Sequence, residues 1–194
     1  MKLTIGFAFA ALACVVAATS GVRSGTAVYH MMPARDATVS YNTFKNADGS
    51  FESLTPKGGQ STLVTFKGNR DYERILLGFN LPSQVKDPSQ ITKCVLNVPV
   101  PKDAPDQDYA LTAYAASSNW DEDTVNAATK ITSIRQLGSV NIPSGQNPGS
   151  IDVTGACQAA AEGKFSMFVD TSQPLVTFYS RDSGKPTFSL DLTY

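Results

Sequence analysis

One apolar row decides the fold class, and it lies in the stretch Arg74-Ile75-Leu76-Leu77-Gly78-Phe79-Asn80-Leu81. Every second residue from Ile75 onward is large and apolar, whereas the alternate positions, which begin at Arg74, include a cation, a glycine and an amide. Successive side chains of a β-strand point to opposite faces of a sheet. The alternation therefore predicts a strand with one buried face.

Two further runs show the same alternation. Residues 94–100 and 188–192 each carry an apolar side chain at every second position. Two sheets that pack on such rows form a β-sandwich. Short runs rich in β-branched and aromatic residues, separated by clusters of Pro, Gly, Asn and Asp, extend the pattern along the chain. The predicted strands are residues 26–32, 37–41, 61–67, 73–80, 92–100, 109–115, 165–170, 175–180 and 187–193.

The first residues have the layout of a secretory signal peptide. Lys2 precedes a long apolar run, and small residues follow that run. We predict a signal peptide over residues 1–18, with cleavage after Ala18 or, alternatively, after Ser20. The run is shorter than the roughly 20 apolar residues that span a bilayer, which favours cleavage over a membrane anchor. A lipoprotein signal at Cys14 is a third alternative.

The remainder, residues 19–194, fits one domain, which we predict to be a single β-sandwich. Loss of Lys2 takes the 16 basic residues to 15, against 17 acidic ones, so no strong field attracts nucleic acid or anionic membrane. No later segment is long and apolar enough to be a membrane span. We therefore expect a secreted protein, extracellular or cell-wall associated, with neither nucleic acid nor membrane as a partner.

The chain has three cysteines, and the first leaves with the signal peptide. Cys94 and Cys157 then form an even pair in an oxidising compartment, so we predict one disulfide. A short helix is predicted over residues 155–162, with Thr154 as its N-cap and Gly163 at its end. The disulfide would tie this helix to the inward face of the strand that carries Cys94.

The sequence lacks the usual catalytic motifs. His30 is the one histidine in the chain, and it lies in a predicted strand. There is no Gly-x-Ser-x-Gly, His-Glu-x-x-His or Walker-type motif to accompany it. We therefore predict no catalytic residue and no enzyme.

Two clusters of carboxylates qualify as metal ligands. Carboxylate oxygens suit calcium, although neither cluster has the spacing of an EF-hand loop. A bound calcium ion and ordinary solvated loop charges both stay open, and no other cofactor is expected. A pair of carboxylates is also what a glycosidase needs. The clusters are Asp121, Glu122 and Asp123 beside Trp120, and Asp103, Asp106 and Asp108 in a separate loop.

Five short motifs follow one another along the chain. They are RILLGFNLP (74–82), ITKCVL (91–96), WDEDTV (120–125), IDVT (151–154), and FYSRD (178–182) with PTFSL (186–190). Their order resembles that of the DNRLRE domains, also classed as family 96 carbohydrate-binding modules, and it spans nearly the whole chain after the signal peptide. Two positions depart from the family pattern, since Asn80 replaces the usual Asp and Asn126-Ala127 replaces a frequent Thr-Trp.

The resemblance implies a jelly-roll-like antiparallel β-sandwich that binds polysaccharides, with acidic polymers such as alginate among the family's ligands. Family members occur as parts of larger chains. We therefore expect a secreted noncatalytic carbohydrate-binding protein for an acidic or cell-wall polysaccharide. Two alternatives stay open. One is a structural or adhesive component of a cell wall, spore coat or matrix, and the other is a polysaccharide lyase or hydrolase, since lyases can use a Tyr base near an Arg.

The candidate ligand-binding residues are five cations and one tyrosine. Each sugar of a uronate polymer presents a carboxylate and several hydroxyls, and Arg suits bidentate contacts with carboxylates. Arg74 and Arg181 could equally serve as structural ion-pair partners, and the two lysines as solvated surface charges. Trp120 is expected to pack under a loop rather than to stack on a sugar ring. The candidates are Lys57, Lys67, Arg70, Tyr72, Arg74 and Arg181.

Overall fold

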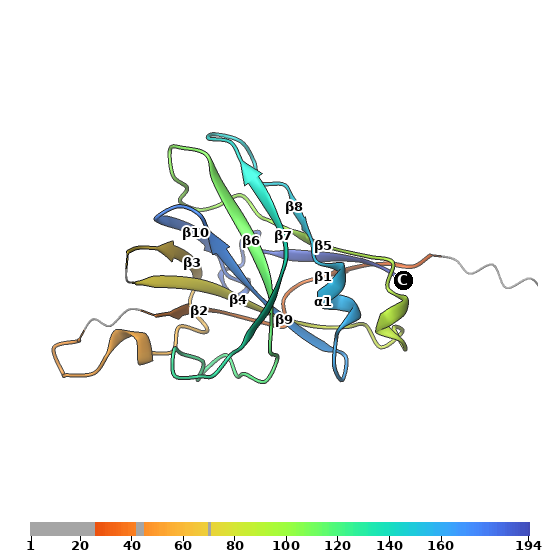
Figure 1. The fold of residues 1–194 in the computed structure, drawn as a ribbon, viewed down its shortest axis with the longest axis horizontal. Coiled ribbons are helices and arrows are strands. Elements are labelled where there is room, and N and C mark those ends of the chain that lie inside the picture. Colours follow the sequence, from red (N-terminus) through yellow and green to blue (C-terminus); the bar gives the residue numbers. More distant parts are fainter. Residues whose placement is uncertain (1–25, 42–44, 70) are drawn as a thin grey trace, which may run out of the picture.

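The fold is an antiparallel β-sandwich of two sheets (Figure 1). The structure is a computed structural model that describes residues 26–41, 45–69 and 71–194. The smaller sheet has the strand order β1-β11-β5-β8. The larger sheet has the order β10-β3-β4-β9-β6-β7, and β2 pairs with β4 as its seventh strand. The strands are β1 (Val28–Met31), β2 (Arg35–Ser40), β3 (Thr62–Lys67), β4 (Tyr72–Asn80), β5 (Lys93–Asn97), β6 (Tyr109–Ala116), β7 (Ser133–Ile142), β8 (Ser150–Asp152), β9 (Lys164–Thr171), β10 (Leu175–Tyr179) and β11 (Ser189–Thr193).

The predicted all-β sandwich with one short helix and one disulfide is confirmed. Each of the nine predicted strands has a counterpart. The predicted signal peptide and its cleavage site lie outside the described residues, so both stay predictions. In the ranges that the structure does describe, no helix has the length and apolar character needed to cross a bilayer.

The stretch that predicts the fold forms β4, and its apolar row is buried. Ile75, Leu77 and Phe79 are at most 1% exposed and belong to the main core. The same core includes Leu96 of β5 and Leu190 of β11, so it joins the two sheets. Burying a side chain of this size contributes about 1.5–3 kcal/mol. The alternation seen in the sequence therefore corresponds to the contact that holds the sandwich together.

The prediction for the apolar row over residues 94–100 is wrong at its C-terminal end. The strand expected over residues 92–100 stops at Asn97, and Val100 is 60% exposed rather than buried. Pro99 and Pro101 flank Val100. Proline has no backbone N–H to donate to a ladder, so the two prolines end the strand.

Two strands were not predicted, β7 and β8. β7 pairs only with β6 in the sheet order, and most of its residues are exposed or half-buried. Its sequence, SIRQLGSVNI, therefore shows no apolar alternation over most of its length. β8 has three residues and is too short to give a pattern. An edge strand with few buried side chains carries little sequence signal.

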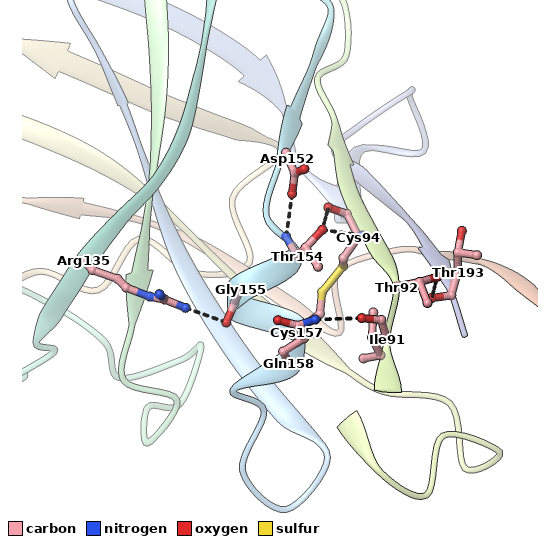
Figure 2. The surroundings of a disulfide bond; sticks show 10 residues. All are labelled: Ile91, Thr92, Cys94, Arg135, Asp152, Thr154, Gly155, Cys157, Gln158 and Thr193. Atoms are coloured by element: carbon pink, nitrogen blue, oxygen red, sulfur yellow. Dashed lines mark hydrogen bonds between the residues drawn. A yellow bond between two sulfur atoms is a disulfide. The ribbon is translucent and has the colours of Figure 1, made fainter. Parts of the chain in front are cut away.

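The helix α1 (Thr154–Gln158) is shorter than the predicted 155–162, and Thr154 is not its N-cap. Figure 2 shows that the Thr154 hydroxyl instead accepts a hydrogen bond from the Cys94 backbone N–H at 2.9 Å. Gly163, at φ +72°, lies in the turn before β9 rather than at the helix end. The predicted disulfide between Cys94 and Cys157 is present. It ties α1 to β5, as expected.

A second, smaller core lies on the outer face of the larger sheet. Leu76 of β4 and Phe168 of β9 point away from the main core and pack with β2 and with the loop between β6 and β7. That loop contributes Trp120 and Val125, which are 6% and 0% exposed. The loop therefore covers only one part of the outer face, and the sheet beyond it can form a site.

Candidate functional site

A groove of about 320 Å³ opens on the outer face of the larger sheet. We call it the sheet groove. Its volume is at the lower end of the range for small-ligand sites, roughly 300–1,000 Å³. The side chains that matter for its chemistry come from β3, β4, β6 and β9. They are Lys67, Tyr72, Arg74, Thr112, Tyr114 and Asp170.

Strand alternation places these side chains in the groove. Tyr72 and Arg74 are four and two positions before Leu76 on β4, so they share its outer face. On the neighbouring strands, Thr112 of β6 lies opposite Asp170 of β9 in the antiparallel register. The groove therefore begins where the cover of the second core ends. The same pattern that buries Ile75 and Leu77 inside sends Arg74 outward.

Arg74 and Asp170 form a bidentate ion pair in the sheet groove. Arg74 Nε donates to Asp170 Oδ1 at 2.7 Å, and Nη2 donates to Oδ2 at 3.0 Å. The guanidinium also lies 3.9 Å from the ring centre of Phe168 and 5.5 Å from that of Tyr114. Two of the Arg74 nitrogens are thus already bound. This pair fixes a carboxylate and a guanidinium side by side on an otherwise open sheet.

Tyr72 supplies an exposed aromatic ring at the edge of the sheet groove. It is 44% exposed and stacks on Tyr41, with ring centres 4.5 Å apart and an interplanar angle of 13°. Burial raises the pKa of Tyr41, with smaller effects from neighbouring charges. The stack holds Tyr72 in one orientation, so a ligand that contacts it meets a preordered surface.

The two candidate lysines have different environments. Lys67 lines the sheet groove, is exposed, and has no acidic side chain within ion-pair distance among the described residues. Lys57 lines a neighbouring hollow instead, where its Nζ donates to Glu73 Oε1 at 2.7 Å. Ser40 donates to the same carboxylate oxygen. Of the two lysines, Lys67 is therefore the one placed to meet a ligand in the groove, and Arg70 lies outside the described residues.

Arg181 lies outside the sheet groove, in a network of acidic side chains. Its guanidinium donates to both carboxylate oxygens of Glu122, and its backbone N–H donates to Asp36 Oδ2 at 2.9 Å. The Asp36 N–H in turn donates to Glu122 Oε1 at 2.8 Å. A Cβ on Gly58 would lie 1.9 Å from the Glu122 carbonyl oxygen, so only glycine fits there. Arg181 is therefore a structural ion-pair partner, which is one of the two roles that the sequence left open for it.

Burial raises the pKa of Asp36 to about 6, and the neighbouring Glu122 and Asp182 act in the same direction against the hydrogen bond from Arg181. Asp36 is 1% exposed, and burial disfavours the charged form of a carboxylate because that form is stabilised by water. Glu122 was a candidate ligand from the sequence, but its grouping with Asp36 and Asp182 could not be predicted, because the three lie on separate segments of the chain.

Trp120 packs under its loop, as expected, and is not available to a sugar. Its Nε1 donates to Ser166 Oγ at 3.0 Å, and the Arg35 guanidinium lies 4.3 Å from the ring centre. Arg35 donates onward to the Trp120 and Ser118 carbonyls, both at 2.7 Å. A Cβ on Gly78 would come within 2.9 Å of both side chains, so glycine at that position makes room for the stack.

The two carboxylate clusters expected from the sequence serve mainly local contacts. Asp121 accepts from the Asp123 N–H at 3.1 Å and from the Thr124 hydroxyl at 3.3 Å. In the other cluster, Asp108 Oδ1 accepts from the Ser144 N–H at 2.8 Å. Among the described residues, the one group of three ligand-type side chains that converges is Asp36, Glu122 and Asp182.

An aromatic ring, a fixed ion pair and hydroxyls on one open sheet face of an antiparallel sandwich are groups that can contact a polar ligand. Comparison with known proteins names the class of the protein. The chain belongs to carbohydrate-binding module family 96, whose profile matches residues 27–194. The resemblance to that family is thereby confirmed, whereas the DNRLRE designation stays a prediction.

A curated relative is similar over most of both chains. It is a protein of Arthroderma benhamiae (strain ATCC MYA-4681 / CBS 112371) that bears the name "Uncharacterized secreted protein". It is 32% identical over 157 residues, which cover 78% of each chain. The similarity therefore extends through the sandwich and is not confined to one motif.

Proposed function

We propose that this protein is a secreted, noncatalytic carbohydrate-binding protein that holds an acidic or cell-wall polysaccharide in the sheet groove. The observation that supports it most is the Arg74–Asp170 pair, set beside the exposed ring of Tyr72 in a member of a carbohydrate-binding family. The Arthroderma benhamiae relative bears a name that describes it as secreted, which supports the extracellular location.

The groove offers the groups that a sugar needs. Asp170 can accept hydrogen bonds from sugar hydroxyls, and the Thr112 hydroxyl can donate or accept. The ring of Tyr72 offers an apolar face for the C–H face of a sugar and a hydroxyl at its tip. These groups come from strands of a sheet, so their spacing is set by the ladder and changes little on binding.

Charge in the sheet groove favours a polymer with sparse or moderate negative charge. Asp170 already occupies the bidentate face of Arg74, and Lys57 is paired with Glu73. Among the described residues that line the groove, Lys67 is therefore the cation that can contact a uronate carboxylate, since Arg74 is paired with Asp170. Arg70, three residues further along the chain, is a second candidate for the same carboxylates.

Replacing Lys67 by Ala is expected to weaken binding to an anionic polymer by about five- to tenfold, because one charge-assisted contact is lost. The measurement is retention on a panel of alginate, pectin, chitin, β-glucan and chondroitin-type polymers, followed by titration of the best binder at two salt concentrations. Lys86→Ala is the matched control, since Lys86 is exposed and lies outside the groove lining.

Each outcome of the panel has a meaning. Retention of the wild type and of Lys86→Ala, with weaker retention of Lys67→Ala on anionic polymers, supports the proposal. Retention on none of the polymers contradicts it and favours a structural or adhesive role. Release of shortened or unsaturated sugar products over time would instead show an enzyme.

A further inference from the structure

Three acidic side chains from distant segments meet at one point outside the sheet groove. Asp36 is near the start of β2, Glu122 follows Trp120 in the loop after β6, and Asp182 lies in the 3-10 turn η3 (Arg181–Ser183). One carboxylate oxygen from each lies within 4.8 Å of the other two. The first two residues are 86 positions apart in the sequence, so the cluster is a product of the fold.

One oxygen in this cluster has no partner. Asp36 is 1% exposed, and while its Oδ2 accepts from the Arg181 N–H, its Oδ1 is buried without any hydrogen-bond donor. A buried carboxylate oxygen left without a donor or a cation is costly, because it has given up its water. A carboxylate in this state can serve as a ligand.

The charges of the cluster do not balance. Arg181 donates to both oxygens of Glu122, and its Nη2 lies 3.9 Å from Asp182 Oδ1. The nearby guanidinium of Arg35 is bound to the carbonyls of Trp120 and Ser118 and stacked on the indole ring. Arg35 still carries its charge, which acts on Glu122. Two guanidinium groups, only one of them directly paired, therefore stand against three carboxylates, which leaves an excess of one negative charge when all three are ionised.

We infer that Asp36, Glu122 and Asp182 form a binding site for a divalent cation, and that Ca²⁺ fits it best. The ligands are all oxygens, as Ca²⁺ prefers, whereas Zn²⁺ prefers histidine and cysteine. Ca–O bonds of about 2.3–2.6 Å let one ion bridge oxygens up to about 4.8 Å apart. Ca²⁺ also accepts irregular ligand sets completed by water, whereas Mg²⁺ demands a near-ideal octahedron.

A cation here would join three parts of the outer face. It would connect β2, the loop that carries Trp120, and the turn between β10 and β11. The site includes Glu122 but neither Asp121 nor Asp123, so only one of the residues in the sequence cluster takes part. It shares no residue with the lining of the sheet groove, so the inference stands independently of the proposed function.

Calcium binding by the full secreted chain tests the inference directly. The protein is treated with EDTA, dialysed, and titrated with CaCl₂ and separately with MgCl₂ in a calorimeter. We expect one Ca²⁺ per chain, and a rise in melting temperature of about 5–10 °C at a calcium concentration near 100 times Kd. MgCl₂ should give a much smaller shift.

Two variants assign the binding to these residues. Asp182→Asn alters an exposed ligand and should fold normally, and it should weaken calcium binding by at least about tenfold, since ligand charge sets affinity. Asp36→Asn should lose the calcium-dependent shift altogether. Asp123→Asn is the matched control and should bind calcium like the wild type. No calcium uptake by the wild type, or undiminished uptake by the Asp182→Asn variant, would overturn the inference.

Discussion

The double variant Cys94→Ala/Cys157→Ala is expected to lose about 4 kcal/mol of unfolding free energy relative to the oxidised protein. The two cysteines are 63 positions apart, so their bond closes a long loop and restricts the unfolded chain strongly. Both are fully buried, and the bond is the covalent link between α1 and β5. A loss of this size is a large fraction of the 5–15 kcal/mol that holds an average domain together.

Urea unfolding of the oxidised wild type, the reduced wild type and the double variant measures this loss. The reduced wild type should resemble the double variant. A Gln158→Ala control removes only the 2.8 Å hydrogen bond from α1 to the Ile91 carbonyl and should cost about 1 kcal/mol. A double variant within 1 kcal/mol of the oxidised wild type would show that packing alone fixes α1.

Replacing Trp120 by Ala should cost about 3–5 kcal/mol of unfolding free energy, as is usual for a buried aromatic residue. The indole is 6% exposed, fills the second core, and satisfies Ser166 through a 3.0 Å hydrogen bond. Its loss also removes the surface on which Arg35 stacks. The Ser166 hydroxyl would be left buried without its donor.

Urea unfolding at neutral pH checks this second expectation, and Tyr72→Ala is the control. Tyr72 is an aromatic residue on the same face of the larger sheet, but it is 44% exposed. Its replacement should therefore cost much less stability than that of Trp120. A Trp120→Ala variant that loses less than 1 kcal/mol would contradict the packing role and return Trp120 to the list of sugar-binding aromatics.

The sequence was a good guide where one strand shows its whole pattern locally. The alternation from Arg74 to Leu81 predicts both the buried row and the outward position of Arg74, because the period of a strand is two. The disulfide between Cys94 and Cys157 could also be predicted, since only two cysteines remain once a signal peptide is removed. In contrast, β7 is an edge strand with a mostly exposed, polar sequence, so its pattern was too weak to identify.

Contacts between distant strands could not be predicted in this way. Arg74 and Asp170 are 96 positions apart, and their pairing depends on the register of β4 against β9. The sequence left open whether Arg74 binds a ligand carboxylate or forms a structural ion pair, and the structure shows its guanidinium paired with Asp170. The cluster of Asp36, Glu122 and Asp182 likewise depends on three loop and strand ends that only the fold brings together.

The most direct test of binding in the sheet groove is calorimetric titration of Tyr72→Ala with the polysaccharide that the wild type retains best. Tyr72 is exposed, stacks on Tyr41 and lines the groove, so its loss removes a preordered sugar contact without opening the core. We expect binding to weaken by at least about tenfold, which is 1.4 kcal/mol, with a melting temperature close to that of the wild type. Unchanged affinity in the folded variant would contradict the account and place the carbohydrate site elsewhere on the sandwich.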